Sequence, residues 1–394
     1  MGVVSPAQSV ERAQTARKWG SSGLAYLTGL PGGPPDFSRA NVLAHAERIA
    51  ADAATLLTGR AGLLGLTPGG RISASGRTRL LAAADGWCAI TLSRPDDVAA
   101  IPALLAADEV PEDPWPMLQR WAATRLVAAI NERAEPLGLP AAALGEAAAV
   151  PPHIRRRGLR GSQRGPVGLL VADLSSMWAG PLCGRLLARA GATVVKVESP
   201  ARPDGARSGN PAFFDWINSE KLSYCVDFDR DTNELRALLA TADVVIDASP
   251  PTALARLGPD HIAPRPGRIW LRISGHGERS RRPVCGDDAA VAGGLVGTST
   301  QGPVFCGDAI ADPLAGLEAS REVAESLRRG GGELIDVSMA AVAATYAALP
   351  TGPSVSVYPA APPPAPPPTR PAAALGADNA AVRRLIAERR CFSC

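Results

Sequence analysis

The sequence lacks a long apolar run, since none approaches the ~18 residues typical of a membrane-spanning helix. Its N-terminus has no basic segment followed by an apolar one, and Pro6 stands where an N-myristoylation signal needs Ser or Thr. The sequence also lacks a large excess of either charge. It contains 41 Lys and Arg residues and 38 Asp and Glu residues, which give a net charge of +3. We therefore expect a cytoplasmic protein that binds neither membranes nor nucleic acids.

Residues that bind metals are sparse. Seven cysteines, an odd number spread along the chain, favour reduced thiols over a disulfide framework. Cys391 and Cys394 form a Cys-x-x-Cys pair without a second pair to complete a zinc site, so the role of this pair is left open. The four histidines also lack the spacing of metal ligands: His45, His153, His261 and His276. We expect no metal cofactor.

What the sequence does contain is a strand, a turn, a helix and a second strand within residues 169–198. An apolar run ends at Asp173, small residues turn the chain, and a helical pattern extends to Ala190, where Gly191 stops it. A β-branched segment, 193–197, then closes on Glu198. This order predicts a parallel βαβ crossover. The Gly-x-Gly-x-x-Gly fingerprint is absent, which argues against dinucleotide binding.

The βαβ unit resembles the start of the family III CoA-transferases, the CaiB/BaiF family that includes formyl-CoA transferase and the acyl-CoA racemases. Those chains begin Asp-Leu-Ser…Ala-Gly-Pro…Gly-Ala-Asp-Val-Ile-Lys-Val-Glu, and this chain has related motifs at 173–175, 179–181 and 191–198. Further matches follow in family order at 218–228, 242–247, 271–277, 311–316, 335–339 and 375–378. The resemblance covers about 167–380. It implies an α/β fold, with a Rossmann-like parallel sheet domain and a smaller mixed α/β lobe, in an interlocked homodimer.

By this resemblance the chain is a CoA-transferase that moves CoA from an acyl-CoA thioester to a carboxylic acid, with Asp312 as the catalytic residue. In the family the transfer proceeds through covalent anhydride and thioester intermediates on this aspartate. An aspartate suits the task because its carboxylate is ordinarily ionised at pH 7. Asp308 is a rival nucleophile. We favour Asp312 because Gly316 follows it at the family's spacing.

The residues around Asp312 also have a structural interpretation. The sequence Ala311-Asp312-Pro313 is typical of a helix start, with Asp as the N-cap and Pro at the first helical position. The two roles are compatible, because a helix N-terminus supplies amide donors for a developing oxyanion.

CoA contacts are also implied by the resemblance. Met177, Trp178 and Ala179 would line the nucleotide pocket, and Lys221 and Arg256 would approach the phosphates. The family often carries Asn-Phe-Arg-Pro-Gly after its Ala-Asp-Val-Val-Ile strand, whereas this chain has Ala-Ser-Pro-Pro-Thr at 248–252. That departure removes an amide and an aromatic ring from the expected pocket.

Two alternatives to a transferase remain open. The racemase branch uses a histidine in a Gly-His-Asp segment, where this chain has Gly286-Asp287-Asp288. Asp287 is a poor substitute for an imidazole unless its pKa is strongly perturbed, which disfavours an acyl-CoA racemase or epimerase. A catalytically inactive auxiliary subunit is the other alternative. Donor and acceptor acids are not readable from the sequence.

The domain order is unusual for the family. Residues 1–150 resemble a degenerate second half and small domain, because the motifs at 22–35 and 69–75 recur at 294–303 and 332–338. We expect a basic linker at 151–166, a Rossmann-like CoA-binding catalytic domain at 167–350, and a Pro-rich tether with a C-terminal helix at 351–394.

Overall fold

The computed structural model describes residues 6–248, 262–278 and 280–391. The chain forms two compact units. Unit 1 consists of Met1–Pro151, Gly275–Leu314 and Met339–Pro366, and unit 2 consists of Pro152–Ser274, Ala315–Ser338 and Pro367–Cys394. Both units are discontinuous in sequence, whereas the expected domains were continuous. Two segments of the expected catalytic domain thus group with the N-terminal 150 residues.

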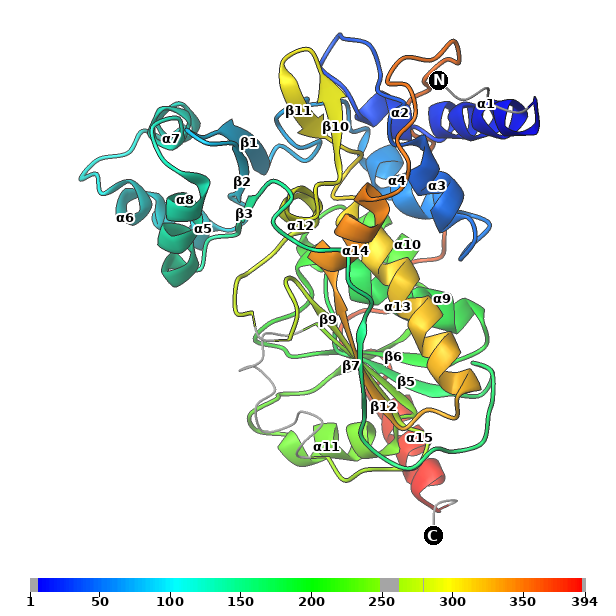
Figure 1. The fold of residues 1–394 in the computed structure, drawn as a ribbon. Coiled ribbons are helices and arrows are strands. Elements are labelled where there is room, and N and C mark those ends of the chain that lie inside the picture. Colours follow the sequence, from blue (N-terminus) through cyan, green and yellow to red (C-terminus); the bar gives the residue numbers. More distant parts are fainter. Residues whose placement is uncertain (1–5, 249–261, 279, 392–394) are drawn as a thin grey trace. The chain divides into compact units, whose positions relative to one another are not determined.

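Unit 2 contains a seven-stranded sheet among the described residues, in the order β4-β12-β9-β8-β5-β6-β7 (Figure 1). All neighbouring strands are parallel except β4, which runs antiparallel to β12. Strand order reverses between β5 and β8, as in doubly wound α/β folds. The expected Rossmann-like sheet is therefore confirmed. The strand bounds are β4 His153–Arg156, β5 Leu170–Asp173, β6 Thr193–Glu198, β7 Leu222–Cys225, β8 Val244–Asp247, β9 Ile269–Ser274 and β12 Glu333–Ser338.

The predicted βαβ crossover is present as β5, α9 (Ala179–Arg189) and β6. Every residue of β5 is buried, which explains its unbroken apolar run before Asp173. Gly191 ends the helix because it adopts φ 97°, a left-handed conformation that suits glycine after a helix.

The helices of unit 2 form two groups against the sheet. α9 packs on β5 and β6 and contacts α10 (Pro211–Asn218), whereas α11 (Thr232–Thr241) packs on α15 (Asn379–Cys391). The crossover from β5 to β6 and the return from β7 to β8 run in opposite directions, so right-handed connections place their helices on opposite faces. The short 3₁₀ helix η2 spans Gly205–Ser208, and α13 spans Ala311–Arg328.

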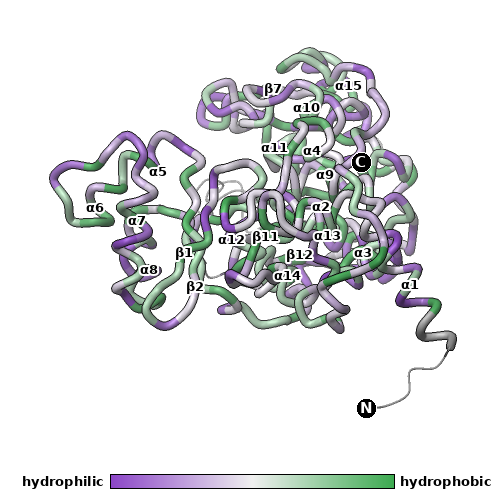
Figure 2. The backbone as a smooth tube through the Cα atoms, turned by 90° about the horizontal axis from the view of Figure 1, so that it is seen from above, coloured by the Kyte–Doolittle hydropathy of each residue, from purple (hydrophilic) through white to green (hydrophobic). Residues whose placement is uncertain are grey.

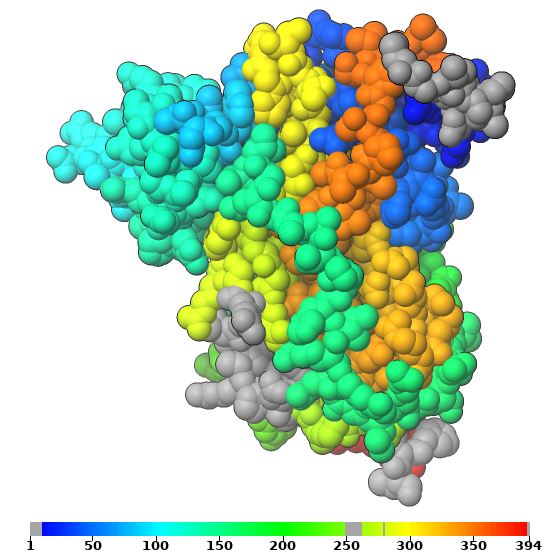
Figure 3. All heavy atoms as spheres, viewed as in Figure 1, coloured from blue at the N-terminus to red at the C-terminus, as the bar shows by residue number. Residues whose placement is uncertain are grey.

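The segment expected to be a basic linker is exposed and also contributes a strand. Figure 3 shows residues 152–166, in green-cyan, on the visible surface. β4 lies at the edge of the sheet, and all four of its residues are exposed. Charged side chains are favourable there because they discourage pairing with another sheet edge.

Unit 1 combines small helices with short antiparallel strands. β1 (Thr78–Ala82), β2 (Trp87–Thr91) and β3 (Ala141–Ala143) form one sheet, and β10 (Val296–Ser299) pairs with β11 (Gly302–Phe305). The remaining elements are α1 Pro6–Ser21, α2 Leu24–Leu27, α3 Ala40–Ala46, α4 Ala53–Leu64, α5 Pro95–Ala99, α6 Ile101–Leu105, α7 Trp115–Ala122, α8 Val127–Ala134, η1 Glu135–Leu137, α12 Gly286–Ala292 and α14 Met339–Ala347.

Elements distant in sequence share the interior of unit 1. α12 packs on β2, β3 and α14. An added Cβ at Gly293, just after α12, would lie 2.4 Å from the Ala344 nitrogen, so the two helices approach closely. Hydrophobic and hydrophilic residues alternate along α7 and α8 in Figure 2, and their apolar sides pack over β1 to β3.

The Pro-rich segment has no helix or strand between residues 351 and 374, as its composition predicts. Within unit 1 it nevertheless packs closely. An added Cβ at Gly20, Gly23 or Gly62 would lie 2.3–2.4 Å from the backbone of Pro359, Pro363 or Pro364. These three glycines provide the room that the segment needs.

No helix in the described part of the chain is both long and apolar enough to cross a bilayer.

Candidate functional site

Four aspartates lie at or beside the start of α13 in unit 1: Asp287 and Asp288 on α12, Asp308 in the preceding turn, and Asp312 on α13. We call them the aspartate cluster. The cluster combines both candidate nucleophiles with the segment that replaces the racemase histidine. Its four members have different surroundings.

Asp308 is fully buried and bonded to an arginine from α4. Arg60 Nη1 donates to both carboxylate oxygens, at 2.6 and 2.7 Å. Burial raises the pKa of Asp308, while the guanidinium of Arg60 favours its ionised form. Both oxygens of this carboxylate are thus engaged, which makes Asp308 a poor nucleophile.

Asp312 is partly exposed and occupies the second position of α13. The expectation that it is the N-cap is therefore wrong, because the helix already begins at Ala311. Burial raises its pKa to about 7, with Asp287 and Asp308 adding to the increase and Arg60 opposing it. From the sequence we also expected the Asp312 carboxylate to be fully ionised at pH 7, and the raised pKa contradicts this. Instead, Asp312 is divided between its two protonation states near neutral pH.

Asp287 and Asp288 accept hydrogen bonds at the start of α12. Asp287 Oδ1 accepts from the Ala309 N–H at 3.0 Å, and its Oδ2 accepts from the Thr78 hydroxyl at 3.3 Å. Burial and, next, the Asp308 charge raise the pKa of Asp287 to about 6. Asp288 Oδ1 accepts from the Thr91 hydroxyl at 2.9 Å, and burial raises the pKa of Asp288 to about 8. Asp287 thus has the perturbed pKa that acid–base chemistry would require.

The expected CoA-binding turn lies in unit 2, between β5 and α9. Met177 is 54% exposed and adopts φ 69°, while Trp178 and Ala179 are buried. Asp204 Oδ1 accepts a hydrogen bond from the Met177 N–H at 3.0 Å. Trp178 packs edge-to-face on Phe213. Of the three predicted pocket residues, Met177 presents a largely exposed side chain.

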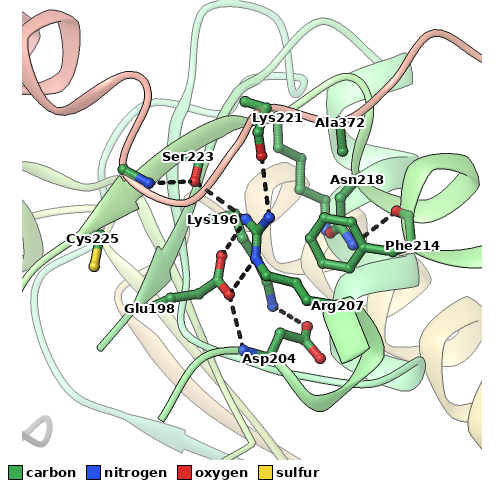
Figure 4. Close-up of polar contacts among 12 residues, drawn as sticks. Lys196, Glu198, Asp204, Arg207, Phe214, Asn218, Lys221, Ser223, Cys225 and Ala372 are labelled. Carbon is green, nitrogen blue, oxygen red and sulfur yellow. Dashed lines mark hydrogen bonds and ion pairs between the residues drawn. The ribbon is translucent and has the colours of Figure 1, made fainter. Parts of the chain in front are cut away.

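Lys221 is buried inside unit 2 (Figure 4). Its Nζ donates to Asp173 Oδ2 and to the Pro181 carbonyl, both at 2.8 Å. Burial lowers the pKa of Lys221, and Asp173 opposes that effect. A direct phosphate contact would require Lys221 to leave these partners. Arg256, the other predicted phosphate residue, lies outside the described residues.

Two further ion pairs lie beside Lys221 at the carboxyl ends of the strands. Lys196 Nζ contacts Asp204 Oδ2 at 2.6 Å, and Arg207 contacts Glu198 at 2.7 Å. Figure 4 shows Arg207 between Glu198 and Ser223. With the pair of Lys221 and Asp173, the group contains three ion pairs, so three cations face three carboxylates. This group, whose charges balance, stabilises the turn through the contact from Asp204 to Met177.

Among residues 6–248, 262–278 and 280–391, no three His, Cys, Asp or Glu side chains are arranged to hold a metal ion. Cys391 is an exposed free thiol, and Cys394 lies outside those ranges.

Comparison with known proteins identifies the family. A family model described as CoA-transferase family III matches residues 167–362. The chain belongs to CoA-transferase family III. The matched residues include the whole aspartate cluster and Lys221 but not Arg60. Arg60 gives no sequence signal of its role, because it lies in the segment outside the family match.

Relatives of this family III chain include named transferases. Succinate–glutarate CoA-transferase of Agrobacterium fabrum is 30% identical over 200 residues, which cover 44% of this chain and 50% of the relative. Succinyl-CoA–D-citramalate CoA-transferase of Chloroflexus aurantiacus is 29% identical over 203 residues, covering 45% and 50%. The chain thus spans about half the length of the curated relatives it matches. A crystal structure of a hypothetical protein from Mycobacterium tuberculosis is 28% identical, covering 47% of this chain and 56% of that chain, with a TM-score of 0.42.

Proposed function

We propose that this protein is a CoA-transferase that uses Asp312 as its nucleophile. The family match supports the reaction class, and the contrast between the two candidate aspartates supports the residue. Asp308 has both oxygens bonded to Arg60 in a fully buried position, whereas Asp312 is partly exposed. That contrast is the observation that carries the assignment.

The first half of the reaction transfers CoA onto the protein. The ionised Asp312 carboxylate attacks the carbonyl carbon of the acyl-CoA, the C–S bond breaks, and a mixed anhydride and CoA thiolate form. The thiolate then attacks the side-chain carbonyl carbon of Asp312. This step releases the donor acid as a carboxylate and leaves an aspartyl-CoA thioester.

The second half reverses the sequence with a different acid. The acceptor carboxylate attacks the thioester carbon of Asp312, which gives a second mixed anhydride and CoA thiolate. The thiolate attacks the acyl carbon of the acceptor, so acceptor-CoA forms and Asp312 returns as a carboxylate. Neither water nor a redox partner enters, and the charges balance at each step.

The test is covalent trapping on Asp312. We expect incubation with succinyl-CoA, followed by hydroxylamine, to convert Asp312 into a hydroxamate detectable by peptide mass spectrometry. Glutarate and citramalate are the first acceptors to try, because relatives carry these names. Asp312→Asn should lose trapping and turnover, while Asp308→Asn should still be trapped on Asp312. Trapping on Asp308 instead would contradict the assignment.

CoA binding in this proposal uses the exposed edge of unit 2. The carboxyl ends of parallel strands next to a reversal of strand order are where open α/β sheets bind ligands. Met177 lies at that edge, and Trp178 and Ala179 support it. Lys221 serves the turn through Asp173 and Pro181, and Arg256 is proposed as a phosphate contact. We also propose that the protein is cytoplasmic. We further propose that it forms a homodimer, and sedimentation analysis would test this oligomeric state.

A racemase or epimerase is the second candidate, and the perturbed aspartates favour it specifically. With pKa values of about 6 and 7, Asp287 and Asp312 can hold one proton between them at neutral pH. One carboxylate could then remove an α-proton and the other acid return it. Incorporation of deuterium at the α-carbon in D₂O, without Asp312 trapping, would select this reaction. Absence of both signals would indicate an auxiliary subunit.

A further inference from the structure

The turn that leads into α13 has an unusual backbone. Gly307 adopts φ 68° and Ala309 adopts φ 41°, and both angles lie in the left-handed region. Glycine enters that region freely, but alanine is strained there. Such a conformation persists only where surrounding contacts hold it, and it is common at functional sites. Asp312 follows Ala309 by three residues, so the path of this turn sets where Asp312 lies.

Three side chains outside the turn hold it. Thr28 Oγ1 accepts from the Gly307 N–H at 3.0 Å. Asp287 Oδ1 accepts from the Ala309 N–H at 3.0 Å. Between them, Arg60 donates to both oxygens of Asp308. Consecutive residues of the turn are thus held from three separate elements.

Two of the three come from the first 150 residues. Thr28 is fully buried at the end of α2, where its hydroxyl also donates to the Leu24 carbonyl at 2.8 Å. Arg60 lies on α4. Both residues precede the family match, which starts at 167. The N-terminal segment therefore supplies contacts to the turn from residues that the matched region does not contain.

Electrostatic interactions also link Arg60 to Asp312. The groups that act on Asp312 are Arg60 from α4, Asp287 from α12, Asp308 from the turn and the Gly286 N–H. The Cys285 thiol is also near, and burial keeps it neutral by raising its pKa well above the usual value. Arg60 is a cation that faces these carboxylates, so it opposes the increase in the pKa of Asp312 that burial and the neighbouring carboxylates cause.

We propose that Arg60 and Thr28 are positioning residues for the Asp312 chemistry: they hold the 307–310 turn, and Arg60 keeps both oxygens of Asp308 bonded and outside the reaction. This inference rests on the proposed role of Asp312. It assigns to the N-terminal segment a direct share in preparing the nucleophile.

The decisive variant is Asp308→Asn. The amide removes one negative charge and leaves Arg60 in place, so Asp312 should ionise more readily and its titration should move to lower pH. The probe is labelling of Asp312 by a carbodiimide and a small amine, which modifies the protonated acid, quantified by mass spectrometry from pH 5 to 9. This readout needs no turnover. An unchanged midpoint would overturn the electrostatic role of the Arg60–Asp308 pair.

The positional role is tested on Arg60 itself. Arg60→Met should lower kcat by roughly 10- to 100-fold with little change in KM, because small displacements of reacting groups have effects of this size. Arg60→Lys should restore part of the loss. The matched control is Arg48→Met, since Arg48 is an exposed arginine between α3 and α4. Equal kcat in the Arg60 and Arg48 variants would overturn the proposal.

Thr28 provides a second route if Arg60→Met does not fold. Thr28→Val keeps the shape but removes the acceptor for Gly307, whereas Thr28→Ser keeps that acceptor. We expect a loss of kcat in the valine variant and recovery in the serine variant; equal rates for both would contradict the role of Thr28. If the wild-type protein transfers no CoA but Asp308→Asn still shifts Asp312 labelling, the proposed function fails and the electrostatic action of the Arg60–Asp308 pair on Asp312 stands.

Discussion

At the residue scale, the aspartate cluster shows how one side-chain type acquires different properties from its surroundings. Asp308 contacts a guanidinium, Asp288 accepts hydroxyl and amide hydrogen bonds in a fully buried position, and Asp312 is partly exposed. Burial raises the pKa of each, and Arg60 opposes the increase at Asp308 and Asp312. Two predictions at this scale depend on those differences.

The first concerns the pH dependence of transfer. The reactive form of Asp312 is the carboxylate, so kcat should rise with pH as the acid deprotonates and reach a plateau above its pKa of about 7. Asp312→Asn should abolish turnover at every pH. A rate that is already constant from about pH 5 upward would contradict the raised pKa. Rapid-quench assays across the pH range provide the measurement.

The second concerns Asp288 and stability. Because the pKa of Asp288 is raised to about 8, the folded protein retains a proton that the unfolded chain loses above about pH 4. The free energy of unfolding should therefore fall as pH rises from about 4 to 8. Asp288→Asn removes this dependence, so its stability relative to the wild type should increase over that interval. Urea denaturation at several pH values measures it, and a constant difference would count against the prediction.

At the element scale, close packing depends on glycine where a helix approaches another. Gly316 on α13 is an example within unit 2, because an added Cβ would lie 2.6 Å from the Ala179 carbonyl and 3.0 Å from Leu182 Cβ. The spacing from Asp312 to Gly316, which first favoured Asp312, thus has a packing explanation. The assignment now depends on the surroundings of the two aspartates instead.

Gly316→Ala should therefore destabilise the fold by about 1–3 kcal/mol, because α13 and α9 would have to separate. Gly165→Ala is the control: nothing lies within 4 Å of its added Cβ, and its φ is not in the left-handed region. The control should be neutral or slightly stabilising. Equal melting temperatures for the two variants would disprove the packing role.

Lys221 leads to a different prediction from the phosphate contact expected by resemblance. Lys221→Met removes the cation that pairs with the buried Asp173 carboxylate. The loss of this pair should lower the free energy of unfolding by about 3–5 kcal/mol. CoA affinity should fall as a consequence of the disturbed turn. The double variant Lys221→Met with Asp173→Asn removes both charges and should recover much of the stability. Recovery of folding without recovery of CoA binding would instead support a phosphate contact.

The local sequence was enough to predict individual helices and strands but not the contacts between residues far apart in the chain. β5, α9 and β6 were readable because an apolar run, small turn residues and Gly191 follow one another within about 30 residues of chain. The strand at His153–Arg156 was missed because its charged residues show no apolar alternation and its pairing partner is β12. Arg60 and Asp308 are 248 residues apart, and neither has a local pattern that specifies the other.

At the scale of the whole molecule, the first 150 residues are part of unit 1 and not an appendage. They contribute Thr28, Arg60, Thr78 and Thr91, each of which bonds to the aspartate cluster or its turn. A fragment of residues 152–394 should therefore unfold at a lower temperature and label more readily at Asp312. Limited proteolysis that releases this fragment with full transferase activity would contradict the assignment.

The discontinuity of the two units also has a consequence for how the protein is made. The chain changes unit five times, at residues 151, 274, 314, 338 and 366. Arg60 leaves the ribosome 248 residues before Asp308, which at about 5–20 residues per second is a wait of roughly 12–50 s. Neither unit can complete its core until nearly the whole chain has been synthesised. Nascent chains of this protein therefore expose apolar surface for much of their synthesis, which makes them clients for chaperones that act at the ribosome.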